Sequence, residues 1–220
     1  MPTDRILVIN PNSSACVTQA IDTALTALRA RSPFGIDVMD IPQAPAGVAL
    51  QSDADHAAPL VQALIARHKA AAYAIACFSD PGLYGARENA PGTPIRGIGE
   101  SAILHALTKG ERFGIIALSE KSVFRQRRLI RCMGVTERYA GSCPIDTSAA
   151  GATDHRLLNR MVEAAGHLRR QGADILVMGC AGMAHFQAEL EKQCNVPVIE
   201  PTQAAVALLI GDLCLAAPSV

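Results

Sequence analysis

The feature that most constrains the fold of this chain is an internal repeat. Shifting the 220-residue sequence by 103 positions places Cys77 on Cys180. Three further segments coincide at this shift, and a fourth, near the N-terminus, coincides at a shift of 107: 72–76 with 175–179, 94–95 with 197–198, 101–103 with 204–206, and 5–13 with 112–120. Matches in the same order at a nearly constant offset indicate a duplicated unit. We therefore predict two similar lobes, related by a pseudo-twofold axis, with a cleft between them.

Short apolar runs alternate with helical stretches along the whole chain. The runs that we interpret as buried strands are 6–9, 36–39, 72–77, 94–98, 113–118, 174–178 and 196–199. The predicted helices are 18–30, with Ser13 or Ser14 as a cap, 54–69, a stretch beginning near residue 83, 100–108, 154–171 and 203–215. Continuous apolar strands favour parallel sheets that are covered by helices on both faces.

The predicted fold class is therefore α/β, with two pseudo-symmetric lobes. Each lobe is a short, mostly parallel sheet flanked by helices, and the active site lies in the cleft between the lobes. We place the N-terminal lobe at residues 1–98, with 203–220 packing back on it, and the C-terminal lobe at 99–202.

Composition argues against several classes of partner. The 20 basic and 20 acidic side chains balance, and no basic stripe with aromatic residues is present, so we expect no nucleic-acid binding. The longest apolar stretches, near 70–78 and 204–210, are too short to span a bilayer, so we expect no membrane partner. Since the N-terminus also lacks the pattern of a signal peptide, we predict a cytoplasmic protein.

The seven cysteines do not form a disulfide or metal pattern. Their number is odd and no C-x-x-C pair occurs, which argues against a disulfide framework and against structural zinc, so no metal is expected. Nucleotide-binding loops of the G-x-x-x-x-G-K-[ST] and G-x-G-x-x-G types are absent, and the four lysines offer no evident anchor for pyridoxal phosphate. We therefore predict an enzyme without a cofactor.

Cys77 and Cys180 stand apart from the other cysteines because only they coincide in the repeat. Each lies at the carboxyl end of an equivalent predicted strand, and ligands of parallel sheets bind outside the carboxyl ends of strands. The two thiols are thus expected to face the cleft from opposite sides. Racemisation beside a carbonyl group needs a proton removed from one face of a carbon and another delivered to the opposite face, which two opposed acid–base groups can do.

Four loops are candidate walls of the cleft. Ser79 and Asp80 follow Cys77 and can cap the next helix or contact a ligand, and the small residues of 179–182 bring backbone N–H groups close to a developing enolate. Asn10 and Asn12 offer side-chain amides after the first strand. Ser119 coincides with Asn12 in the repeat and is the equivalent candidate of the second lobe.

Three motifs carry a resemblance to a known family: Ile6-Leu7-Val8-Ile9-Asn10-Pro11-Asn12-Ser13-Ser14, Cys77-Phe78-Ser79-Asp80-Pro81-Gly82, and Gly179-Cys180-Ala181-Gly182. With them the chain resembles, over nearly its whole length, the hydantoin and allantoin racemases of the aspartate/glutamate racemase superfamily. The resemblance implies two α/β lobes, no cofactor, a homo-oligomer, and Cys77 and Cys180 as the acid–base pair. It also implies that Asn12 and the groups at Phe78, Ser79, Ala181 and Gly182 hold the substrate.

The substrate expected from this resemblance is a 5-substituted hydantoin or allantoin. Amino-acid racemases of the superfamily usually follow their cysteines with Asn-Thr or Thr-His pairs, whereas Phe78 and Ala181 stand here and favour a less charged ring or ureido compound. Three alternatives remain open. They are a cysteine-dependent amino-acid racemase, a maleate-type isomerase with a cysteine nucleophile, and a binding module that kept the fold without catalysis.

Overall fold

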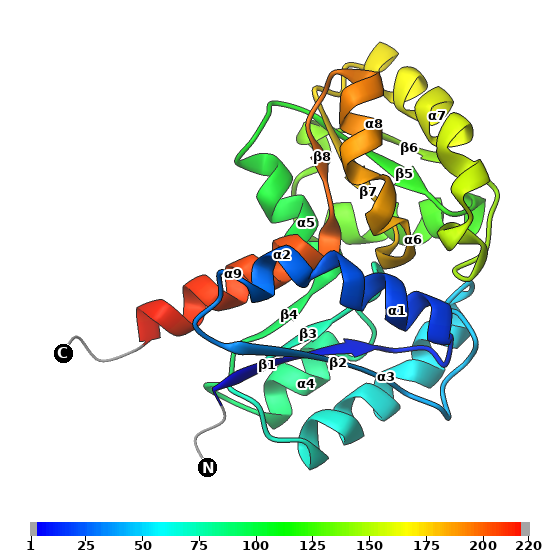
Figure 1. Cartoon of the computed structure of the whole chain (residues 1–220). Helices are drawn as coiled ribbons and strands as arrows, with labels where there is room; N and C mark the ends of the chain where they lie inside the picture. Colours follow the sequence, from blue (N-terminus) through cyan, green and yellow to red (C-terminus); the bar gives the residue numbers. More distant parts are fainter. Residues whose placement is uncertain (1–3, 217–220) are drawn as a thin grey trace.

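The computed structural model describes residues 4–216, which form two four-stranded parallel sheets (Figure 1). The strands of the first sheet are β1 (Arg5–Asn10), β2 (Gly35–Asp40), β3 (Ala72–Ile75) and β4 (Ile95–Gly97). The strands of the second sheet are β5 (Phe113–Ala117), β6 (Tyr139–Pro144), β7 (Ile175–Met178) and β8 (Val198–Ile199). All sheet pairings are parallel, which confirms the predicted α/β class.

The topology of the two sheets confirms the internal repeat. The strand order is β2-β1-β3-β4 in the first sheet and β6-β5-β7-β8 in the second, so each strand has an equivalent partner in the same position. β3 and β7 begin 103 residues apart, as do β4 and β8. A duplicated sequence has thus folded into a duplicated sheet.

Helices cover both faces of each sheet, as expected for strands that are apolar throughout. Their bounds are α1 (Ala15–Ala24), α2 (Thr26–Arg29), α3 (Gln51–Arg67), α4 (Leu83–Asn89), α5 (Ile98–Leu107), α6 (Glu120–Cys132), α7 (Leu158–Arg170), α8 (Gln187–Cys194) and α9 (Pro201–Ala216). The first sheet packs against α1 and α9 on one face and α3 and α4 on the other. The second packs against α7 and α8 on one face and α5 and α6 on the other.

Two equivalent helices connect the halves of the molecule. α5 follows the last strand of the first sheet but packs on the second sheet, and α9 follows the last strand of the second sheet but packs on the first. The two helices also pack against each other. In Figure 1, α9 runs back across the first sheet toward the C-terminus. The lobe boundaries at residues 98 and 202 stay a prediction, and residues 1–3 and 217–220 lie outside the described part.

One strand and two α-helices were not predicted from the sequence. β6 was missed because its segment, YAGSCP, has no apolar run, and all its residues are only half-buried at the edge of the second sheet. α6 and α8 were missed because their composition is strongly polar and only one face of each is buried. The predicted helix 18–30 was also wrong in its extent, since α1 begins at Ala15 and a break at Leu25 separates it from α2.

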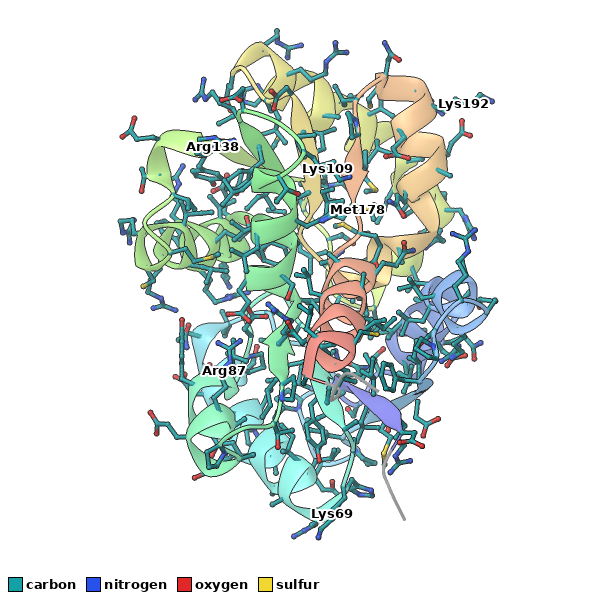
Figure 2. All side chains as sticks on the ribbon, turned by 90° about the vertical axis from the view of Figure 1, so that its left-hand side faces the viewer. Lys69, Arg87, Lys109, Arg138, Met178 and Lys192 are labelled. Atoms are coloured by element: carbon teal, nitrogen blue, oxygen red, sulfur yellow. The ribbon has the colours of Figure 1, made fainter. Side chains whose placement is uncertain are left out.

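Charged side chains lie at the outer ends of the two halves, whereas the inner strand β7 is buried. Figure 2 shows Lys69 and Lys192 at opposite outer ends of the two halves, while Met178, the last residue of β7, lies inside the second half. Met178 is fully buried. Within residues 4–216, no helix is long and apolar enough to cross a bilayer.

Candidate active site

The two repeat-related cysteines lie at equivalent places and line one cavity. β3 ends at Ile75 and β7 ends at Met178, so each cysteine is the second residue after the carboxyl end of its strand. Cys77 and Cys180 both line a small cavity of about 40 Å³, together with residues from both halves of the chain. Most of the lining is apolar. The remaining polar side chains are Asn12, Ser79, Ser122, Arg125 and Gln126.

Cys77 is half-buried beside the amide and hydroxyl groups of Ser79. Withdrawal from water raises the pKa of the Cys77 thiol to about 11, and the nearby Asp80 carboxylate contributes to the rise. Hydrogen bonds from Ser79 and the positive charge of Arg125 act in the opposite direction, because they favour the thiolate. The raised pKa of Cys77 favours the protonated thiol at neutral pH.

Cys180 stands immediately before a short 3₁₀ helix, Ala181–Phe186, that packs against α1 of the first half. The side chain is buried, which raises its pKa to about 12, while the backbone N–H of Gly182 favours the thiolate. Gly182 is confined by the second half: a Cβ atom there would lie 3.3 Å from the carbonyl oxygen of Ala149 and 3.7 Å from Cys180 Sγ. Its small size lets the N–H group approach the sulfur.

Asn10, the last residue of β1, and Asn12, which follows the strand, have different roles. Asn10 is fully buried and donates from Nδ2 to Asn12 Oδ1 at 3.2 Å and to Thr18 Oγ1 at 3.0 Å, but it does not line the cavity. Asn12 lines the cavity, and its Oδ1 also accepts the Ser14 N–H at 2.9 Å. Both contacts fix the amide orientation. Among the hydrogen bonds of residues 4–216, none uses Asn12 Nδ2, which is thus available to a ligand.

The other predicted site residues divide between the cavity and its surroundings. Phe78, Ser79 and Ala181 line the cavity. Ser119 does not: it is the N-cap of α6, where its Oγ accepts the Ser122 N–H at 3.4 Å. Ser119 lines an adjacent cavity of about 250 Å³, which shares Ser122 and three apolar residues with the first.

Asp80 is placed away from the cavity, so the proposed ligand contact is not supported by its position. Its carboxylate accepts the backbone N–H groups of Gly99 at 2.9 Å and Glu100 at 2.8 Å, at the start of α5. The expectation that it caps the helix beginning near residue 83 is wrong, since α4 has no side-chain cap hydrogen bond. Because a helix begins with N–H groups that lack partners, a carboxylate there is a stabilising cap.

The second half caps its equivalent helix with a carboxylate from a different position. Glu200 is buried and accepts the N–H groups of Thr202 at 3.1 Å and Gln203 at 2.6 Å, at the start of α9. At the repeat shift of 103, Glu200 coincides with Gly97. A Cβ atom on Gly97 would lie 2.1 Å from the Asp80 carboxyl carbon. Asp80 thus fills the space that a side chain at Gly97 would take.

The carboxyl groups of Asp80 and Glu200 each affect the pKa of one of the two thiols. Withdrawal from water raises the pKa of Asp80 to about 8 and that of Glu200 to about 7, against the N–H hydrogen bonds that favour ionisation. When ionised, Asp80 raises the pKa of Cys77 and Glu200 raises that of Cys180. Each half therefore pairs one cysteine with one helix-capping carboxyl group.

Two functional candidates, Arg125 and Gln126, were missed because α6 itself was not predicted. Gln126 is buried, lines the cavity and accepts from Ser142 Oγ at 2.6 Å through Oε1. None of the hydrogen bonds found in residues 4–216 involves its Nε2. The signal that could have revealed both residues was the repeat, since α6 follows β5 as α1 follows β1.

Comparisons with known proteins identify the family of the chain and agree with its fold. The chain matches the family described as Asp/Glu/Hydantoin racemase over residues 6–209. It is 34% identical to the hydantoin racemase of Rhizobium meliloti, over 92% of this chain and 86% of that protein. It is 32% identical to the hydantoin racemase of Paenarthrobacter aurescens, over 91% and 87% of the two chains.

A solved structure of a racemase is also similar to this chain. The allantoin racemase from Klebsiella pneumoniae superimposes with a TM-score of 0.86 at 30% sequence identity, covering 96% of this chain and 88% of that one. Both lobes are thus shared with that protein. On the family match and on these identities, the chain belongs to the Asp/Glu/hydantoin racemase family.

Proposed function

We propose that this protein is a cofactor-independent racemase of a 5-substituted hydantoin or of allantoin, with Cys77 and Cys180 exchanging the C5 proton on opposite faces of the ring. The observation that carries the proposal is the placement of both thiols, at repeat-related positions, on one cavity. A thiolate on one side removes the proton, and the thiol on the other side delivers one. For the mirror-image substrate the two roles are reversed.

The polar lining suits a neutral cyclic ureide. Removal of the C5 proton places negative charge on the adjacent ring carbonyl oxygen, and donors that are already in position stabilise that charge. Asn12 Nδ2 and Gln126 Nε2 are two such donors, since both side chains line the cavity and their oxygens are held by other groups. The names of the hydantoin and allantoin racemases to which the chain is similar support the same class of substrate.

The proposal is tested with enantiopure hydantoins and allantoin in deuterated water. We expect loss of optical rotation together with incorporation of deuterium at C5 of at least one compound, measured by polarimetry and NMR. Absence of exchange across both substrate types would refute it. A covalent adduct on one cysteine with maleate, detected by mass spectrometry, would instead favour the isomerase alternative.

The raised thiol pKa values predict the pH dependence of the reaction. The free enzyme needs one thiolate, and its population rises about tenfold per pH unit below the pKa of about 11 at Cys77. Because the two thiols interact, the first ionisation belongs to the pair. We expect log(kcat/KM) to rise with a slope of about 1 between roughly pH 7 and pH 9. A plateau that begins near neutral pH would contradict this expectation.

A further inference from the structure

Arg125 is a cation in the thiol cavity with only neutral hydrogen-bond partners. Its Nε donates to Ser79 Oγ at 3.1 Å, and its two terminal nitrogens donate to the backbone carbonyl oxygens of Ala49 at 2.7 Å and Val48 at 3.3 Å. These contacts fix the guanidinium group between the loop before α3 and the segment that follows Cys77. Each terminal nitrogen carries two N–H groups and makes one of these bonds, so each has a further N–H with which to bind a carboxylate oxygen.

Among the half-buried arginines of residues 4–216, Arg125 and Arg138 bind only neutral groups, and of these two only Arg125 lines the thiol cavity. Arg87 forms a salt bridge with Glu100, and Arg96 forms a two-bond salt bridge with Asp212. Of the salt bridges found within residues 4–216, none includes Arg125, and no Asp or Glu side chain lines the thiol cavity. Partial burial lowers the pKa of Arg125, which shows that the cation is poorly solvated.

A half-buried cation that lacks a counter-ion is costly, and the cost falls when an anion enters. The charges that favour the cation are those of Cys77 and of Asp53, but Asp53 does not line the cavity and makes no salt bridge with Arg125 among the described residues. An anion in direct contact with the guanidinium group inside the cavity would therefore be the ligand or Cys77. The adjacent cavity of about 250 Å³ gives a ring substituent room beside Ser122 and Val48, which both cavities share.

We propose that Arg125 is a specificity-determining residue that selects a substrate with a carboxylate on its C5 substituent. This inference rests on the proposed racemase function and narrows it from neutral hydantoins to anionic ones. The ring would lie between the two thiols, and the carboxylate would accept hydrogen bonds from the guanidinium group of Arg125. Phe78 and Ala181 led to the expectation of a less charged substrate. Arg125 instead favours a negative charge on the C5 substituent, while the ring stays neutral.

The test compares two substrates that differ only in charge: 5-(carboxymethyl)hydantoin and its carboxamide, 5-(carbamoylmethyl)hydantoin. We expect the natural protein to prefer the carboxylate in kcat/KM by a factor of roughly 10 to 100, the range of a charge-assisted hydrogen-bond pair. Arg125→Gln should remove that preference, chiefly through a higher KM for the carboxylate. For the carboxamide kcat/KM should fall less, and only because the Cys77 thiolate loses a favourable charge. Arg125→Lys should retain part of the preference, because it keeps the charge but not the fork.

Arg128→Gln is the matched control. Arg128 lies one turn along α6, is exposed, and binds Gln51 Oε1 outside the cavity, so its loss removes the same charge without touching the site. This control should keep the carboxylate preference. Should Arg125→Gln not fold, the preference of the natural protein and of Arg125→Lys still decides the question.

Two results would overturn the inference while leaving the racemase intact. One is that the natural protein exchanges neutral hydantoins or the carboxamide but shows no preference for the carboxylate. The other is an equal fall for both substrates in Arg125→Gln, which would assign the cation to the Cys77 thiolate. If the natural protein exchanges no hydantoin and no allantoin, the proposed function fails, and the inference fails with it.

Discussion

Replacing Cys77 by serine is expected to lower racemisation of the substrate about 10³-fold or more, while C5 exchange continues on one enantiomer only. A serine hydroxyl is too weak an acid to supply a base at neutral pH, so the contribution of one acid–base group, roughly 10² to 10⁴, is lost. Cys180 remains and can remove and return the proton from its own face. Cys180→Ser should show the mirror-image result, with exchange confined to the other enantiomer.

Chiral chromatography combined with mass spectrometry measures both quantities in deuterated water. Cys132→Ser serves as the control, since Cys132 is an exposed cysteine at the end of α6 and does not line the cavity. It should racemise at the rate of the natural protein. The two-thiol account is contradicted if either single variant at Cys77 or Cys180 racemises within about tenfold of that rate.

Gly97→Ala is expected to destabilise the fold by about 2–4 kcal/mol, although glycine is not needed there for its backbone freedom. Gly97 has φ of −85° and ψ of 148°, which any residue adopts. The added Cβ would lie 2.1 Å from the Asp80 carboxyl carbon, so the carboxylate must move and release the N–H groups of Gly99 and Glu100. Overpacking costs about 1–3 kcal/mol, and loss of a helix cap costs about 0.5–2 kcal/mol.

A double-mutant cycle separates this explanation from general damage to the core. Because Gly97 and Asp80 compete for one space, Asp80→Gly should cost little more once Gly97→Ala is present, which makes the two changes less than additive. The double variant Gly97→Glu with Asp80→Gly copies the arrangement of Glu200 in the second half and should recover stability relative to Gly97→Glu alone. Urea denaturation measures each free energy of unfolding, and strict additivity would contradict the account.

The repeat made most of the fold predictable from the sequence. It placed equivalent strands before Cys77 and Cys180, and their position two residues after β3 and β7 follows from the way parallel strands end at one edge of a sheet. Hydrophobic runs also located seven of the strands. β6 was not predicted, because an edge strand that is half-buried along its length needs no apolar run.

The site was less predictable than the fold, because several of its contacts depend on packing between the halves. The position of Asp80 beneath α5 depends on the empty space at Gly97, which sequence spacing does not reveal. Arg125 reaches Ser79 and the carbonyl of Ala49 only after α6 packs beside the loop before α3. Asn12, by contrast, could be predicted, since its place after β1 follows from the order of the chain.

The distribution of isotope in the first few per cent of turnover tests the central claim most directly. An enantiopure substrate carrying protium at C5 is incubated with the natural protein in deuterated water, and each enantiomer is analysed separately. If Cys77 and Cys180 act from opposite faces, the new enantiomer carries deuterium from the outset, because its proton comes from a thiol already equilibrated with solvent, while the remaining substrate keeps protium. New enantiomer that carries the original protium would show that one group moves the proton across the ring, and would contradict the account.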